Sequence, residues 1–233
     1  MKTLYLLTES DTDDLFYEAC AERMTGAPFT PVPRRLRQGG GITEVRKALP
    51  YVLSEIKQMQ KGSGAHLLIA LDNDRAPHAA ALEALSPEQR RALPNRDSHK
   101  QDRYAALLAT LHETLGYDHS KWPIPVAIAI PVEMLETWLL LTALGGQANA
   151  LPRFAWQDSD GARQFHGTSQ PPPQLKDLTY LSIVRDGFPN AFDWIFHLVF
   201  ERLDPIDLAN RSASFALFKQ CVDQWPHAAT HSN

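Results

Sequence analysis

The sequence has few cysteines and no long hydrophobic run. Cys20 and Cys221 are the two cysteines among 233 residues. They lie about 200 positions apart in apolar helical patterns, so we expect buried free thiols and no disulfide. No apolar stretch approaches the roughly 20 residues of a membrane-spanning helix, and the N-terminus has no signal-peptide pattern. These features predict a cytoplasmic protein that does not associate with a membrane.

Several catalytic and binding motifs are also missing. The chain has no Gly-x-x-x-x-Gly-Lys-Ser/Thr phosphate loop and no Gly-x-Ser-x-Gly elbow, so we expect neither ATP hydrolysis of its own nor serine-hydrolase chemistry. The nine histidines show no metal-ligand spacing. The net charge of −4 gives no general attraction to nucleic acid. A polyanion would therefore have to bind through a local basic patch or a metal ion.

Short apolar runs alternate with helical patterns along the first half of the chain. Residues 3–7, 67–71 and 124–130 read as strands buried on both faces. An extended, proline-rich segment and amphipathic helices lie between them, which is the order typical of a parallel sheet with helical crossovers. The sequence thus predicts an α/β fold with a mostly parallel sheet flanked by helices. We expect residues 1–145 to form the α/β domain, and residues 146–233 to add a loop and a helical extension on the same core.

Acidic residues follow each of the three predicted strands. Glu9 comes after the first strand, Asp72 and Asp74 after the second, and Glu133 and Glu136 after the third. The carboxyl ends of parallel strands meet at one edge of a sheet, where α/β proteins place ligands. Carboxylate oxygens are hard ligands suited to Mg²⁺ or Mn²⁺. The alternative is that these acids only form turns and cap helices. The pattern leaves open whether Glu133 or Glu136 faces the site.

Basic residues occur at two places that could contact phosphate. Arg34, Arg35 and Arg37 enter a glycine turn, and guanidinium groups with exposed backbone N–H groups can bind a nucleic-acid backbone. Lys176 follows a proline-rich stretch at the start of a predicted helix. In both places, a solvated connection without function is the simpler alternative.

Several short segments carry a resemblance to a known family. The segment Glu9-Ser10-Asp11-Thr12-Asp13 is similar to the Glu-Gly-x-Thr-Glu pattern of OLD-type Toprim nucleases, with serine in place of glycine and aspartate in place of the second glutamate. The stretch Glu136-x-Trp138-Leu139-Leu140 resembles the small Toprim-like proteins grouped as domain of unknown function 4276. The proline-rich approach to Lys176 and the late segment Arg211-Ser212-x-Ser214-Phe215-x-x-Phe218 resemble that group too.

The resemblance implies a Toprim-like fold, Mg²⁺-dependent cleavage of DNA or RNA, and a role beside ATPase partners in bacterial anti-phage defence. In that reading Asp72 and Asp74 anchor the metal, and Glu9 is a ligand or general base. Asp13 and Glu136 complete the shell, while Lys176 offsets charge on the phosphate. Two other interpretations stay open: a non-catalytic or partner-activated subunit of an ATPase-containing complex, and a nucleotide-binding sensor.

Overall fold

The computed structural model describes residues 2–37, 40–59, 64–73, 83, 86–88, 102–131, 135–144 and 175–225. The chain forms two compact units. The first comprises Met1–Leu71, Tyr104–Ala129 and Leu217–Asn233, and the second comprises Asp72–Arg103 and Ile130–Ala216. The domain boundary expected at residue 145 lies outside the described residues and stays a prediction.

The first unit contains a four-stranded parallel sheet with the order β2-β1-β3-β4. The strands are β1 (Lys2–Thr8), β2 (Phe29–Arg35), β3 (Ala65–Ala70) and β4 (Val126–Ala129). Every residue of β3 is buried, as expected for an inner strand covered on both faces. The predicted α/β class with a parallel sheet is therefore confirmed.

Strand β2 lies at the edge of this sheet, and its sequence explains why. Pro31 and Pro33 are the register partners of Leu4 and Leu6 on β1. Proline has no backbone N–H, so it is tolerated in a sheet where that side of the strand faces away from a partner. If β2 lay between two strands, the missing N–H groups of its prolines would leave backbone carbonyl oxygens of the second neighbouring strand without donors. The two prolines thus favour the edge position that β2 occupies.

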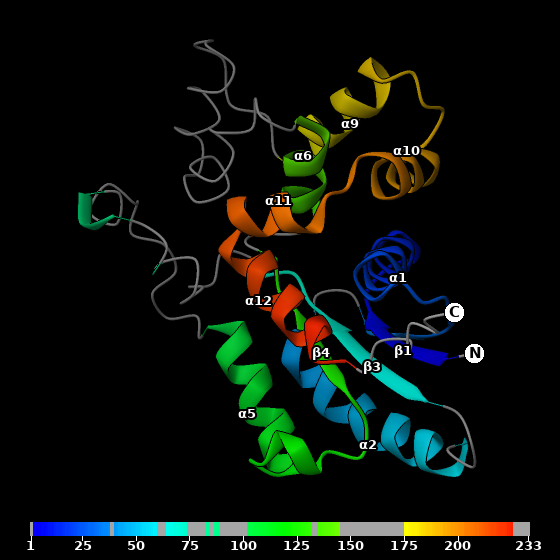
Figure 1. The fold of residues 1–233 in the computed structure, drawn as a ribbon, viewed down its shortest axis with the longest axis vertical. Coiled ribbons are helices and arrows are strands. Elements are labelled where there is room, and N and C mark those ends of the chain that lie inside the picture. Colours follow the sequence, from blue (N-terminus) through cyan, green and yellow to red (C-terminus); the bar gives the residue numbers. More distant parts are fainter. Residues whose placement is uncertain are drawn as a thin grey trace, which may run out of the picture. The chain divides into compact units, whose positions relative to one another are not determined.

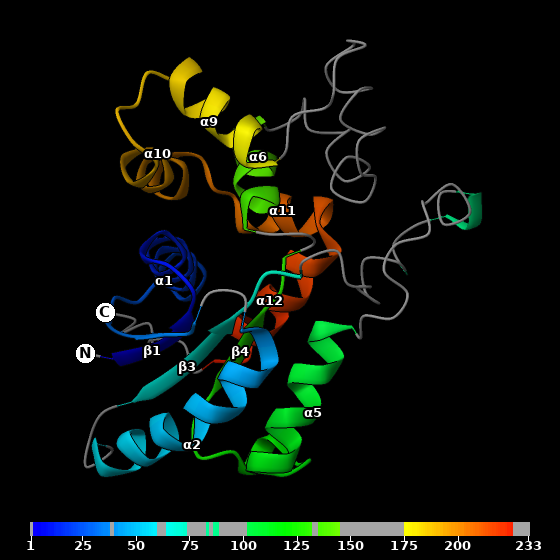
Figure 2. The same cartoon turned by 180° about the vertical axis from the view of Figure 1, so that it is seen from behind.

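Helices cover both faces of the sheet (Figures 1 and 2). Helix α1 and the C-terminal part of α12 lie on one face, and α2 and α5 lie on the other. Their bounds are α1 (Asp11–Thr25), α2 (Gly41–Met59), α5 (Arg103–Leu115) and α12 (Ala213–Asp223), with a short 3₁₀ turn, η1 (His119–Lys121), after α5. Helix α1 ends at Gly26, whose φ of 65° is the left-handed conformation typical of a glycine after a helix.

The second unit is helical in its described part. Its elements are α6 (Glu136–Leu144), α9 (Leu175–Arg185), α10 (Ala191–His197), the π-helical turn η3 (Leu198–Arg202) and α11 (Pro205–Arg211). Helix α6 packs against α9, η3 and α11. Its apolar residues Trp138, Leu139 and Leu140 are buried. The expected helical C-terminal portion is confirmed.

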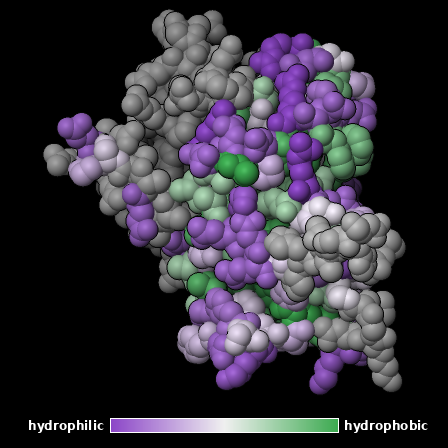
Figure 3. Space-filling view, viewed as in Figure 1, coloured by the Kyte–Doolittle hydropathy of each residue, from purple (hydrophilic) through white to green (hydrophobic). Residues whose placement is uncertain are grey.

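The surface of the described residues is mostly polar on the face drawn in Figure 3, where hydrophobic side chains show only between hydrophilic ones. Within the described part of the chain, no helix is long and apolar enough to cross a membrane. Both cysteines are free thiols; Cys20 is buried and Cys221 is half-buried.

Candidate functional site

The end of β1 passes directly into the cap of α1. The Ser10 hydroxyl accepts the backbone N–H of Asp13 at 3.1 Å, and Oδ2 of Asp13 accepts the backbone N–H of Glu9 at 3.2 Å. These reciprocal bonds satisfy donors that a helix start leaves open. Burial raises the pKa of Asp13 above its ordinary value. Asp13, predicted as a metal ligand, is thus engaged in starting the helix.

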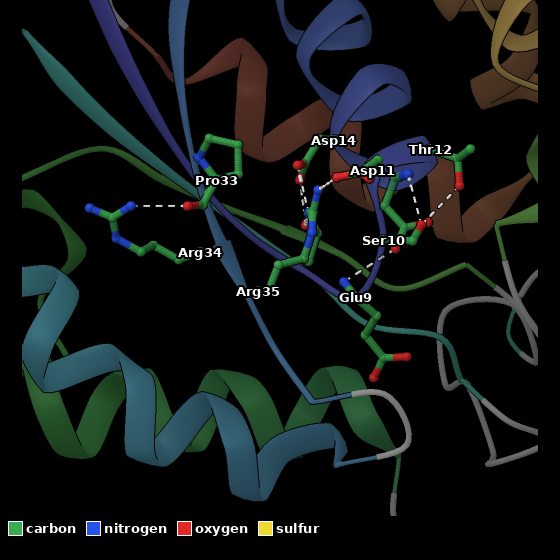
Figure 4. Close-up of polar contacts among 10 residues, drawn as sticks. Glu9, Ser10, Asp11, Thr12, Asp14, Pro33, Arg34 and Arg35 are labelled. Carbon is green, nitrogen blue, oxygen red and sulfur yellow. Dashed lines mark hydrogen bonds and ion pairs between the residues drawn. The ribbon is translucent and has the colours of Figure 1, made fainter.

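The side chain of Glu9 takes a different direction. Figure 4 shows it pointing away from the cluster that Arg35 forms with the acids of α1. It lies one residue beyond β1, at the carboxyl edge of the sheet. The structure therefore places Glu9 at the strand end where the sequence expects it.

A partly buried cluster that the sequence did not predict joins β1, α1 and β2. The Thr8 hydroxyl donates to Asp14, and Arg35 donates to Thr8 Oγ1 at 2.8 Å. Arg35 also pairs with Asp14 at 2.6 Å and with Asp11 (Figure 4). Burial raises the pKa of Asp14 despite its bonds to Thr8 and Arg35. Thr8 is a threonine at the end of a strand, a common residue type there, so the sequence around it did not indicate this cluster.

The three arginines predicted to bind nucleic acid have different surroundings. Arg34 forms an ion pair with Glu55 on α2, and Arg35 belongs to the Thr8 cluster. Arg37 is exposed beside the glycine turn, where its carbonyl accepts the Gly40 N–H at 2.9 Å. Two of the three guanidinium groups are therefore held by acids of the same unit.

Asp72 lies in the second unit, against the start of α6. Its Oδ1 accepts the backbone N–H of Leu135 at 3.1 Å. The Leu135 carbonyl in turn accepts the N–H groups of Trp138 and Leu139, so Leu135 begins the helix. A carboxylate at this position benefits from the positive end of the helix dipole. Arg103 donates to the Asp72 carbonyl oxygen, a contact across 31 positions that spacing alone could not reveal.

This arrangement brings two predicted ligand positions together. Glu136 is the first residue of α6 and directly follows Leu135, whose N–H the Asp72 carboxylate holds. Glu136 is half-buried. Two of the acids predicted to converge therefore occupy neighbouring positions in one unit, although they are 64 positions apart in the sequence.

Two of the segments that carry the family resemblance also meet here. The indole N–H of the buried Trp138 lies 3.1 Å from the hydroxyl oxygens of both Ser212 and Ser214. The Trp138 ring packs edge-on against Phe215, with ring centroids 5.1 Å apart. The Glu-x-Trp segment and the late serine segment thus pack against each other.

The remaining predicted residues are less defined. Asp74 and Glu133 lie outside the described residues. Lys176 belongs to the first turn of α9, and its side chain is likewise outside what the structure describes. Among the described residues, no group of three or more histidine, cysteine, aspartate or glutamate side chains forms a ready metal-binding cluster. Comparisons with protein-family models, curated proteins and solved structures find no match.

Proposed function

We propose that this protein is a Mg²⁺- or Mn²⁺-dependent nuclease that hydrolyses phosphodiester bonds, with its metal site centred on Asp72. The observation that carries the proposal is the position of Asp72 at the start of α6, next to Glu136. The Asp72 carboxylate accepts the N–H of the residue before Glu136, and both side chains carry the hard oxygen ligands that these cations prefer. The positive charge of the cation would relieve their mutual repulsion.

The resemblance to Toprim proteins also implies Glu9 as a further ligand or general base. Glu9 directly follows β1 in the chain, and Asp72 comes two residues after β3. Asp74 and Asp13 are the other proposed ligands, and Lys176 would offset charge on the phosphate.

The resemblance to Toprim proteins supports the same chemistry. It also supports a role in anti-phage defence beside an ATPase partner. DNA and RNA are both candidate substrates, because the residues that would contact the metal recognise phosphate and not the base.

The alternative explanation for Asp72 is that it only caps α6, and one substitution separates the two roles. In Asp72→Asn the amide oxygen can still accept the Leu135 N–H, but the negative charge is lost. We expect metal-dependent cleavage of plasmid DNA, single-stranded DNA or structured RNA to fall at least about 100-fold. The melting temperature should fall only slightly, because the lost charge contributes about 0.3–1 kcal/mol at a helix start. Asp72→Ala, which also removes the cap, should lower stability by about 1 kcal/mol.

Asp223→Asn is the matched control, because it removes a carboxylate from an exposed ion pair with Lys219 on α12. This variant should cleave like the wild type, since such surface pairs contribute little to stability. Equal cleavage by wild type and Asp72→Asn would contradict the proposal. No cleavage by the folded wild type, alone or with an ATPase partner, would favour the nucleotide-binding sensor.

A further inference from the structure

Two histidines that are seven positions apart meet at the C-terminal end of α5. His112 is in the last turn of the helix, and His119 is the first residue of η1. Gly116, with a φ of 91°, ends the helix and allows the chain to turn back. As a result the two Nε2 atoms lie 2.8 Å apart. The sequence spacing gave no sign of this pair, because it depends on the turn.

Aromatic neighbours hold the two imidazole rings in place. The Trp122 ring lies 4.3 Å from His119 and 6.2 Å from His112, measured between ring centroids. Tyr117 lies 4.7 Å from His112 on the same measure. The Trp122 indole N–H donates to the Gly116 carbonyl at 2.8 Å, which fixes Trp122 itself.

The two rings point their nitrogens at each other. Their centroids are 5.0 Å apart, so the Nε2 atoms lie close to the line between the ring centres. In this arrangement one nitrogen donates a proton and the other accepts it. Replacing that proton with a metal ion would use the lone pairs of both nitrogens.

A zinc ion fits between these nitrogens once both rings turn. Zinc–imidazole bonds of about 2.0–2.1 Å in tetrahedral geometry place two ligand nitrogens about 3.3 Å apart. The Nε2 atoms, which face each other, would therefore separate by about half an ångström, and the exposed His119 ring and the half-buried His112 ring would each turn by about 35° to aim their lone pairs at the metal. The nearby charges do not oppose a cation, because Lys121 is paired with Asp118 at 3.0 Å.

We propose that His112 and His119 form a binding site for a transition-metal dication such as Zn²⁺, with water in the remaining coordination positions. Imidazole nitrogen is a ligand for Zn²⁺, Cu²⁺ and Ni²⁺, whereas Mg²⁺ prefers oxygen. The site is therefore chemically distinct from the carboxylates around Asp72, and it does not depend on the proposed nuclease activity. Binding would join the end of α5 to η1 and stabilise the first unit.

The test is a calorimetric titration of the full-length chain with ZnCl₂ at pH 7.5 in excess Mg²⁺, which occupies oxygen-ligand sites. We expect one Zn²⁺ to bind the wild type, and His112→Gln or His119→Gln to weaken that binding at least tenfold. His197→Gln is the control. His197 lies on α10, where it packs against Phe188, and it takes no part in the contact between His112 and His119. Zinc should also raise the melting temperature of the wild type and of His197→Gln, but not of the other two variants.

The proposal is overturned if the wild type binds no Zn²⁺ under these conditions. It is equally overturned if His112→Gln and His119→Gln, folded as judged by circular dichroism, bind Zn²⁺ as tightly as the wild type.

Discussion

Glu18 lies on α1 between two other acids, Asp14 and Glu22, one helical turn to either side. Burial raises its pKa to about 7, with repulsion from Glu22 and Asp14 adding to the effect. Because the folded-state pKa exceeds the ordinary value of 4.5, folding is favoured when the group is protonated. Stability associated with Glu18 is therefore fully present below pH 4.5 and is lost as the pH rises towards 7.

We expect Glu18→Gln to raise the free energy of unfolding at pH 8 by about 1 to 3 kcal/mol, with little change at pH 4. Urea denaturation at the two pH values measures this difference. Glu113→Gln, at an exposed position on α5, serves as the control and should change neither value. A gain of the same size at both pH values would show that ionisation of Glu18 is not the cause.

For single residues, the sequence predicts where a side chain lies along a strand or helix better than it predicts which group that side chain contacts. Acids after the strands were identifiable because a buried apolar run that ends in a carboxylate is a local pattern. The partner of Asp72 is a backbone N–H on another segment 63 positions away, and Arg35 reaches Thr8 across 27 positions. Such contacts depend on how elements pack, which no local spacing encodes.

At the scale of elements, strands and long helices followed from periodicity because each buries one regular face or both. Residues 3–7, 67–71 and 124–130 all contain strand residues of β1, β3 and β4. The seven residues of helix α11 are too few to establish a periodic pattern. The π-helical turn η3 continues α10 and could not be told apart from it by spacing.

The contact of α6 with the start of α12 gives a prediction at this scale. The buried Trp138 N–H has two nearby acceptors, the hydroxyls of Ser212 and Ser214. We expect Ser214→Ala alone to cost little, because Ser212 still accepts the bond. The Ser212→Ala/Ser214→Ala double variant should lose about 1 to 3 kcal/mol beyond the sum of the single changes, since it leaves a buried donor without a partner.

Urea denaturation of the two single variants and the double variant measures this coupling. Trp138→Phe in the double-variant background is the control. It removes the N–H donor, so it should cost less there than in the wild type. Strict additivity of the two serine changes would mean that the indole N–H does not depend on these hydroxyls.

At the scale of the whole molecule, the sequence predicts a parallel sheet covered by helices because the order of strands and helices along the chain permits few other arrangements. It does not predict that the C-terminal end returns to this sheet. Trp225 packs against Phe29 and His66, with ring centroids 5.9 and 4.8 Å away. This closing contact makes the core of the first unit depend on residues from three distant parts of the chain.

His66 therefore makes the stability of this core depend on pH in the acidic range. Burial, with a contribution from Lys2, lowers its pKa from 6.5 to about 4. The unfolded chain binds a proton near pH 6.5 that the folded chain does not bind, so stability is lost as the pH falls from 6.5 towards 4. Glu18 acts in the opposite direction over a similar range. Between about pH 4.5 and 6.5 the two effects nearly cancel, so together the two groups predict a broad plateau of stability over that range.

His66→Leu should remove the acid side of this dependence. We expect the variant to be more stable than the wild type by up to about 3 kcal/mol at pH 4.5, relative to any difference between them at pH 7.5. Any effect of leucine on packing is the same at both pH values, so it drops out when the two stability differences are compared. Thermal and urea denaturation of both proteins at each pH measure these differences. If the difference between variant and wild type were the same at both pH values, protonation of His66 would not limit the stability of this fold in acid.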